Sequence, residues 1–217
     1  MTAGATAQGD AMGTTPSANG GLYRLKARTT RHLDTLIDAT VARSISADAV
    51  TWTGLAVGVL AACTVVAGAR SSPTWWLLIG PLVAIRLGLA VADGEVARRA
   101  DRQRPAGAVL GEVADQAGDV MLAAALAVIA PAPAVLAVIG TLAADDVATI
   151  GWAVTGQRTF PGLGGKPDRN VAVAVGLAAA VVWPWLAPAT AWMLCGLVWV
   201  GAGLRLRALW AAAGTAS

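Results

Sequence analysis

Charge is scarce in this sequence. Only 13% of its 217 residues are charged, whereas soluble domains carry ~25%, and 56% of the residues are hydrophobic. Long apolar runs account for the difference, which indicates membrane spans and argues against one oversized soluble core. The net charge of +3 is small and unevenly spread along the chain, so it bears on membrane topology and gives no sign of nucleic-acid binding.

Residues that bind metals or form disulfides are also rare. The two cysteines, Cys63 and Cys195, are isolated inside apolar runs, which favours buried hydrophobic packing over a disulfide or a metal site. The single histidine, His32, has no ligand cluster around it. Residues 1–20 are mostly Gly, Ala, Thr and Ser, with no apolar core of a signal peptide, so we expect a disordered tail there and a second short tail at 212–217.

Between the two tails, residues 21–211 read as one membrane domain. From Leu22 to Val41 apolar residues recur at helical spacing among four basic residues. This pattern predicts an amphipathic helix over 22–43 that lies on the cytoplasmic membrane face, with a helix for a soluble partner as the alternative. Six apolar stretches follow, each near the ~20 residues that a transmembrane helix needs. They cover residues 50–69, 74–92, 107–130, 133–155, 171–188 and 190–210. The predicted fold class is therefore an all-α integral membrane protein with six transmembrane helices.

The basic residues predict how these spans are oriented. All lysines and arginines except Arg70 and Arg86 fall in the N-terminal region, in connections or at the C-terminal end, on one side of the predicted membrane. Because cytoplasmic loops carry an excess of Lys and Arg, both termini are predicted to be cytoplasmic in a multi-pass protein of the cell membrane.

Carboxylates concentrate where the second predicted span ends and the third begins. Asp93 closes the second span, and Asp115 and Asp119 lie on one helical face of the third, with Glu112 at its border. Acids this close together repel each other unless a cation compensates them, and hard oxygen ligands suit Mg²⁺ or Mn²⁺. The alternative is a set of salt bridges between these acids and Arg86, Arg98 or Arg102.

Other charged residues are placed where they need partners. Arg86 is expected to pair with Asp93, Asp119 or Asp145, or to offer its charge where a metal ligand has been lost. In the connection after the fourth span, Lys166 and Arg169 either contact a phosphate or are ordinary cytoplasmic positive charges. Pro167 occupies the Ser/Thr place of a P-loop, so that motif is excluded.

The chain contains most of a known signature. Asp93-Gly94, Ala97-Arg98 and, after eight residues, Gly107 resemble the signature of the CDP-alcohol phosphotransferase family. Residues 46–51 also resemble the start of that family's first transmembrane helix. Six spans behind a juxtamembrane helix match its architecture, so the resemblance covers nearly all of residues 22–210.

Two positions depart from the signature. Asp93 matches its second aspartate and Asp115 its fourth, but Ala90 stands at the first and Gly111 at the third. In the family the first three aspartates are chiefly metal ligands and the fourth activates the acceptor hydroxyl. Asp119, one turn beyond the signature, is a candidate substitute for a missing ligand.

The resemblance implies an activity and a set of roles. It implies transfer of a substituted phosphate group from a CDP-alcohol, such as CDP-diacylglycerol, to an acceptor alcohol with release of CMP, in phospholipid biosynthesis. Homodimers are common in the family, so a homodimer is also expected. The implied roles are Mg²⁺ or Mn²⁺ binding by Asp93, Asp115 and Asp119, catalysis by Asp115 and Asp119, and substrate binding by Gly94, Ala97, Arg98, Gly107, Lys166 and Arg169. Two alternatives stay open: a degenerate member that binds nucleotide or lipid without turnover, and a small membrane transporter.

Overall fold

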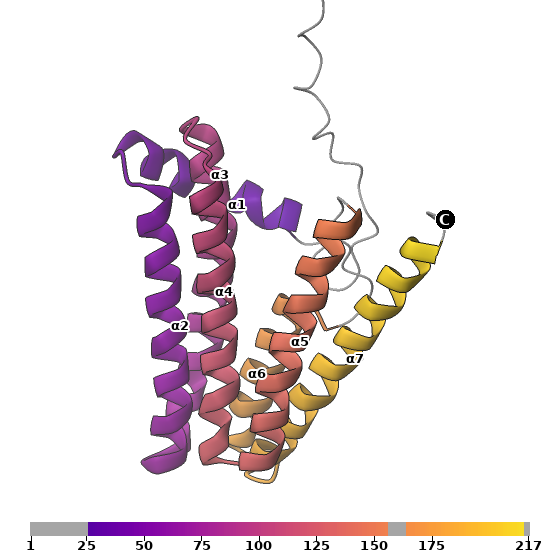
Figure 1. The fold of residues 1–217 in the computed structure, drawn as a ribbon. Helices are drawn as coiled ribbons and strands as arrows, with labels where there is room; N and C mark the ends of the chain where they lie inside the picture. The colour runs from indigo at the N-terminus through magenta and orange to yellow at the C-terminus, as the bar shows by residue number, and fades with distance from the viewer. Residues whose placement is uncertain (1–25, 156–163, 215–217) are drawn as a thin grey trace, which may run out of the picture.

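The computed structural model describes residues 26–155 and 164–214, and in this part of the chain every regular element is a helix (Figure 1). The predicted all-α class is confirmed. The N-terminal tail at 1–20, residues 22–25 of the predicted amphipathic helix and the last residues of the C-terminal tail lie outside the described residues. The α-helices are α1 (Lys26–Ala42), α2 (Ala47–Arg70), α3 (Ile79–Arg99), α4 (Pro105–Ala125), α5 (Pro131–Thr155), α6 (Lys166–Ala180) and α7 (Leu186–Gly214), with short 3-10 helices η2 (Pro73–Leu78) and η3 (Leu126–Val128).

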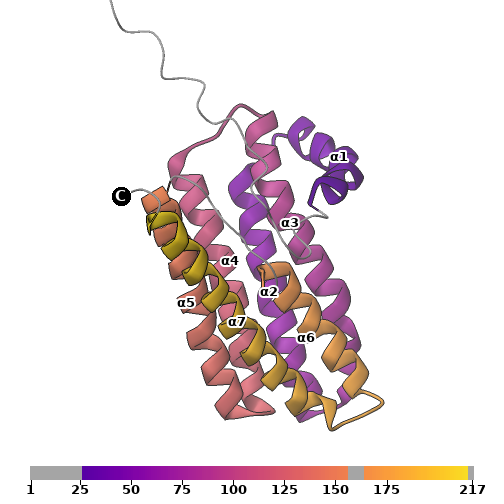
Figure 2. The same ribbon diagram turned by 90° about the vertical axis from the view of Figure 1, so that its right-hand side faces the viewer.

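The helices α2 to α7 form a bundle in which consecutive helices run in opposite directions (Figures 1 and 2). α1 lies across one end of this bundle and packs on α3. The α1 end of the bundle also holds the start of α2, the end of α3, the start of α4 and the C-terminal part of α7. Segments 93–98 and 107–115 thereby lie at the α1 end, and the start of α6, deeper in the bundle, reaches α4 through Lys166 and Glu112 (Figure 2).

Local sequence explains several helix boundaries. The Ser46 hydroxyl accepts a hydrogen bond from the Ala49 N–H at 3.2 Å and caps the start of α2. Pro105 and Pro131 open α4 and α5, and a proline is tolerated there because the first turn of a helix has free N–H groups. α6 ends at Ala180 and not at 188 as expected, because Pro184 forces the chain out of helical geometry before α7 begins.

Four stretches are long and apolar enough to cross a membrane: α2, η2 together with α3, α5, and α7. α4 misses this standard because it carries Glu112, Asp115 and Asp119, and α6 because its 15 residues span only about 22 Å of a ~30 Å hydrocarbon layer. The sequence-based expectation that α4 and α6 also cross the membrane stays a prediction.

A continuous apolar core joins the helices along the bundle. Small residues let the helices approach closely, as is usual in membrane proteins. A Cβ atom at Gly140 would lie 2.6 Å from Val198, and the ring of Trp76 covers Gly68 and donates a hydrogen bond to the Val65 carbonyl at 3.1 Å. The largest fully buried apolar side chains are Ile37, Val65, Ile79, Val96, Leu126, Val173, Leu177 and Val198.

Ion pairs fix α1 to α3. The Arg99 guanidinium contacts Asp34 and Asp38 of α1 and, at 3.0 Å, Glu95 of its own helix. Ile37, between the two aspartates, is buried. α1 lies within the range 22–43 of the predicted amphipathic helix, and the prediction of a juxtamembrane helix on a membrane face stays a prediction.

Candidate functional site

Asp93 is held in a defined orientation near the end of α3. Its Oδ2 accepts a hydrogen bond from the Thr51 hydroxyl of α2 at 2.9 Å, and its Oδ1 accepts the Gly94 N–H at 2.6 Å. The contact with Thr51 joins the signature in α3 to the segment 46–51 that also resembles the family. Arg104, just before α4, contacts Asp48 of the same segment.

The first half of α4 passes directly beside Asp93. A Cβ atom at Gly111 would lie 3.7 Å from the Asp93 Oδ2, which is an ordinary van der Waals separation. Position 111, where the resemblance expects an aspartate, therefore faces Asp93, with room for a side chain. Asp115 follows one turn later on the same face of α4.

The cation that faces these carboxylates is Lys166, the first residue of α6. Its Nζ lies 3.0 Å from Glu112 Oε1 and 3.8 Å from Asp115 Oδ2. Burial favours the neutral amine, but the surrounding carboxylates outweigh burial and raise the pKa of Lys166; they are Asp115, Asp145, Asp119 and Glu112. We call Asp93, Glu112, Asp115 and Lys166 the outer acidic cluster.

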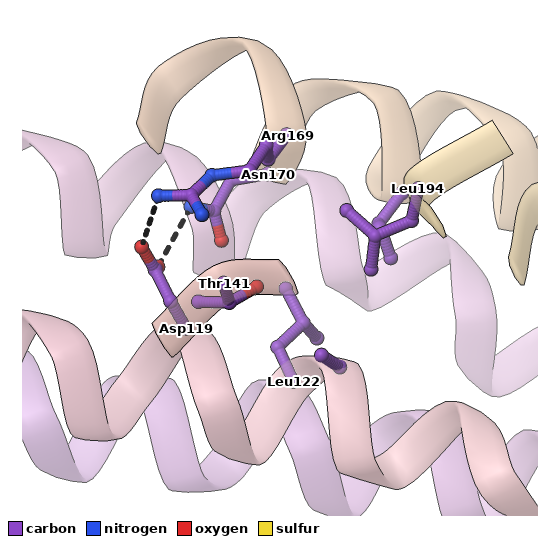
Figure 3. Close-up of a pocket in the computed structure, with 8 residues that line it drawn as sticks. Asp119, Leu122, Thr141, Arg169, Asn170 and Leu194 are labelled. Atoms are coloured by element: carbon purple, nitrogen blue, oxygen red, sulfur yellow. Dashed lines mark hydrogen bonds and ion pairs between the residues drawn. The ribbon is translucent and has the colours of Figure 1, made fainter. Parts of the chain in front are cut away.

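One turn deeper along α4, Asp119 belongs to a different group. Its Oδ1 accepts a hydrogen bond from Arg86 Nη1 at 2.7 Å. Figure 3 shows its contacts with α6, where Oδ1 accepts a hydrogen bond from Asn170 Nδ2 at 2.9 Å and Oδ2 lies 3.5 Å from Arg169 Nη2. All four side chains are buried. The sequence-based expectation that Arg86 pairs with one of three acids is confirmed, and the partner is Asp119.

The same group continues to α5 and α7 through Asp145. Its Oδ1 lies 3.3 Å from Arg169 Nη2 and 3.4 Å from Arg205 Nη1, and Arg205 also donates to the Ala144 carbonyl at 2.7 Å. We call Arg86, Asp119, Asp145, Arg169, Asn170 and Arg205 the buried ion network. It contains three arginines and two aspartates, so its carboxylates are fully compensated by protein cations.

A small cavity adjoins this network (Figure 3). It has a volume of about 10 Å³, enough for a single water molecule, and Asp119, Thr141, Arg169 and Asn170 line its polar side. The Nε and Nη1 atoms of Arg169 find no hydrogen-bond partner among the described protein atoms. One internal water is the natural partner for such donors.

Two glycines make room for Arg86. Its guanidinium passes between α2 and α4, where a Cβ atom at Gly58 would lie 3.1 Å from its Nε and a Cβ at Gly118 would lie 2.6 Å from its Nη2. That Nη2 donates to the Asp115 carbonyl at 2.7 Å. Arg86 therefore connects the buried ion network to the backbone of the outer acidic cluster.

The other predicted site residues are distributed unevenly. Gly94, Ala97 and Arg98 lie at the exposed end of α3, where the Arg98 Nε donates to Glu95 Oε2 at 3.0 Å, and Gly107 lies in the first turn of α4. Arg169 is buried and belongs to the buried ion network, whereas Lys166 belongs to the outer acidic cluster. The salt-bridge alternative holds for Asp119 and Arg86, whereas Glu112 and Asp115 meet a lysine that was not considered as their partner.

Sequence reasoning missed five residues that belong to these groups or contact them: Thr51, Gly58, Gly118, Asn170 and Arg205. A usable signal existed for Asn170, because Arg169 and Asn170 are the last polar residues before the apolar run of this helix. Gly118 stands one residue before Asp119, but no pattern in the sequence shows that an arginine from another helix lies against it.

The donor set decides what kind of metal site the chain can offer. In the described ranges no group of three or more His, Cys, Asp or Glu side chains is placed to hold a metal ion. Mg²⁺, however, is commonly held by one or two carboxylates together with substrate phosphates, and Asp93 and Asp115 supply two. The residues therefore fit a divalent cation that binds with a phosphate-bearing ligand. Both Asp119 oxygens already face protein donors, so its metal role stays a prediction.

Comparison with known proteins identifies the fold. No family model matches the chain. The Escherichia coli (strain K12) inner membrane protein YnbA is 27% identical over 146 residues, which cover 65% of this chain and 72% of that protein. Phosphatidylinositol phosphate synthase of Mycobacterium tuberculosis, crystallised with manganese and citrate, matches with a TM-score of 0.68 and 19% identity over 81% of this chain and 88% of that chain. The same synthase with CDP-DAG bound matches with a TM-score of 0.64 and 20% identity over 86% and 94%. The chain is thus a helical membrane protein with the fold of phosphatidylinositol phosphate synthase.

Proposed function

We propose that the protein is a membrane transferase that moves a substituted phosphate group from a CDP-alcohol, such as CDP-diacylglycerol, to an acceptor alcohol and releases CMP, in phospholipid biosynthesis. The observation that carries this proposal is the meeting of two sequence segments in a bundle of this fold. Asp93 of α3 faces position 111 of α4, and Asp115 follows one turn on. The similar synthase structure with CDP-DAG bound supports the class of donor.

The donor headgroup reaches the site at the α1 end of the bundle, which we place on the cytoplasmic side together with both termini. The side chains of the outer acidic cluster are only partly covered there, with Glu112 and Asp115 about one third exposed (35% and 36%). Arginines at this end, including Arg98 and Arg104, also fit the excess of positive charge on cytoplasmic faces.

Asp93 and Asp115 would hold Mg²⁺ or Mn²⁺ together with oxygens of the pyrophosphate. The ion would supply charge neutralisation for the pyrophosphate and for the leaving CMP. Thr51 and the Gly94 N–H orient Asp93 by donating one hydrogen bond to each of its oxygens. Because these two donors hold the Asp93 carboxylate in place, it keeps its orientation towards the ion without the help of a third carboxylate.

The remaining residues bind, orient and move a proton. Arg98 and Lys166 contact phosphate oxygens, and the small residues Gly94, Ala97 and Gly107 let the nucleotide approach the backbone. One Asp115 oxygen accepts the proton of the acceptor hydroxyl, whose oxygen then bonds to the β-phosphorus. The bond between that phosphorus and the bridging oxygen breaks, and CMP leaves with its electrons.

In place of the metal and catalytic roles expected for Asp119 and the substrate contact expected for Arg169, we assign both residues positioning roles. Each is buried, and neither can reach a ligand in the outer acidic cluster without breaking ion pairs. The contacts of Asp119 with Arg86, Arg169 and Asn170 hold α4 against α3 and α6, so that Asp115 and Lys166 face each other.

The test is CMP release from CDP-diacylglycerol by purified protein in lipid nanodiscs, with Mg²⁺, with Mn²⁺ and with a chelator. Asp93→Asn should lower metal-dependent CMP release by about 10²–10³-fold, because it removes one charged ligand from the transition state. Asp101→Asn, at an exposed turn beyond α3, is the matched control and should keep full activity. Full metal-dependent release by the Asp93→Asn protein would refute the assignment.

A second candidate is a degenerate protein that binds nucleotide or lipid without turnover, and Ala90 and Gly111 favour it. The double variant Ala90→Asp, Gly111→Asp separates the two candidates, since the structure leaves room for a side chain at position 111. A large gain of CMP release over an inactive wild type indicates degeneracy. An active wild type that changes little indicates a transferase that works with its reduced ligand set.

A further inference from the structure

Lys166 stands where a lysine is electrostatically unfavourable. It is the first residue of α6, and the N-terminus of a helix carries partial positive charge that repels cations. Its side chain is nevertheless only 14% exposed. Asp168 caps the same turn by accepting the Gly165 N–H at 3.2 Å. The placement of the lysine is therefore compensated by the carboxylates of α4 that its ammonium contacts.

One of these carboxylates, Asp115, is also the residue that we expect to hold a divalent cation. The Lys166 Nζ lies 3.8 Å from Asp115 Oδ2, and Mg²⁺ lies about 2.1 Å from its oxygen ligands. An ion on Asp115 would therefore lie within about 6 Å of the ammonium while the lysine keeps its present position. Like charges at this distance repel each other strongly in a partly buried site. Lys166 and a divalent cation would therefore compete for the carboxylate of Asp115.

We propose that Lys166 is a built-in competitor of the divalent cation, occupying the outer acidic cluster until an anionic phosphate ligand draws its ammonium away from Asp115. This inference deepens the proposed function and rests on the metal role of Asp115 within it. The lysine side chain is a flexible four-carbon stem with three donors, so it can turn from Asp115 towards a phosphate oxygen. Cation and phosphate ligand then bind cooperatively, because each relieves the repulsion that the other would meet.

The competition is measured directly as Mn²⁺ binding to the purified protein without nucleotide, followed by electron paramagnetic resonance of free Mn²⁺. Lys166→Gln should lower the Kd for Mn²⁺ by about tenfold, because a positive charge near Asp115 is removed. Lys166→Arg keeps the charge and should bind Mn²⁺ like wild type. Arg207→Gln, an exposed residue of α7, removes the same charge elsewhere at this end of the bundle and should also leave the Kd unchanged.

A merely structural lysine would behave differently. Its replacement would change the melting temperature and leave Mn²⁺ affinity as it was or weaken it, and that result with a native circular dichroism spectrum would overturn the inference. The double variant Lys166→Gln, Asp115→Asn should lose the gain, and a gain that persists in it would also count against competition at Asp115. Lys166→Met, which keeps the apolar stem, repeats the measurement if the glutamine variant does not fold.

The outcome is separable from that of the proposed function. A tenfold gain in Mn²⁺ affinity without any CMP release by the wild type would refute the transferase and leave the competition standing. CMP release by the wild type with an unchanged Mn²⁺ affinity in Lys166→Gln would refute the competition and leave the transferase standing.

Discussion

Two groups of charged residues share α4 and differ in almost every other respect. Asp115, in the outer acidic cluster, has a side chain that is 36% exposed, and its nearest described cation is 3.8 Å away. Asp119, one turn deeper in the buried ion network, is 5% exposed and accepts hydrogen bonds at 2.7 and 2.9 Å. Asp115 and Asp119 thus differ in their capacity to bind a ligand, because only Asp115 retains oxygen atoms that a ligand can reach.

The buried ion network ties together helices that carry the outer acidic cluster. Its residues come from α3, α4, α5, α6 and α7, and its charges have little water to stabilise them, so each depends on its partners. Arg86 also donates a hydrogen bond to the Asp115 carbonyl, so the buried ion network holds the backbone of the outer acidic cluster in place at Asp115. The buried ion network therefore fixes the geometry, and the outer acidic cluster is the group that we propose binds the ligand.

The largest expected loss of stability comes from disrupting the buried ion network. Arg86→Ala leaves Asp119 as a buried carboxylate without its closest cation, and loss of one partner of a buried pair typically costs about 3–5 kcal/mol. Denaturant unfolding of the detergent-solubilised protein checks this. Arg98→Ala is the control, since the Arg98 side chain is 61% exposed and Glu95 keeps its contact with Arg99, so its loss should change stability little. Equal effects of the two substitutions would erase the distinction between the groups.

A smaller effect should separate two glycines of α4. Gly118→Ala places a methyl group 2.6 Å from the pinned Arg86 guanidinium and should destabilise the protein by about 1–3 kcal/mol through overpacking. Gly111→Ala meets only an ordinary contact beside Asp93, so the better helix propensity of alanine should make it neutral or stabilising by up to about 1 kcal/mol. Paired thermal melts compare the two, and a Gly111→Ala protein that is the less stable one would contradict the geometry.

The smallest effect is a dependence on alkaline pH. The carboxylates around Lys166 raise its folded-state pKa, so its contribution to stability is fully present below about pH 10.4, the ordinary value in an unfolded chain, and is lost as the pH rises through the higher folded-state pKa. The size should be below about 1 kcal/mol for one partly covered pair. Wild type and Lys166→Met should therefore lose their stability difference above that range. A difference that grows with pH would have the wrong sign.

Much of the layout was predictable from local patterns. Apolar runs and prolines placed most helix boundaries to within a few residues, and the resemblance of residues 93–98 and 107–115 to a known signature predicted that Asp93 and Asp115 belong to one site. The sequence limited the expected ion-pair partner of Arg86 to three aspartates, and the structure shows the pair with Asp119. The end of α6 was expected too late, because the apolar stretch continues through Pro184 while the helix does not.

The partners across helices were not predictable. Gly58 and Gly118 read as ordinary glycines of membrane spans until Arg86 is seen to pass between them, and Asn170 and Arg205 lacked any visible target. Lys166 was read as a phosphate contact or an ordinary surface charge, and its position between Glu112 and Asp115 depends on where α6 begins relative to α4.

The sequence by itself determined the helical class and the membrane character of four helices. These follow from composition, period and spacing, which are properties of neighbouring residues. Ala90 and Gly111 stand where the resemblance to a known signature expects metal ligands, and that interpretation stays a prediction. Only the tertiary structure decided that Asp119 is enclosed by Arg86, Arg169 and Asn170 while Asp115 stays within reach of a ligand. The physical reason is that exposure and charge compensation depend on side chains delivered by other helices, and helical spacing places a residue on a face without saying what that face meets.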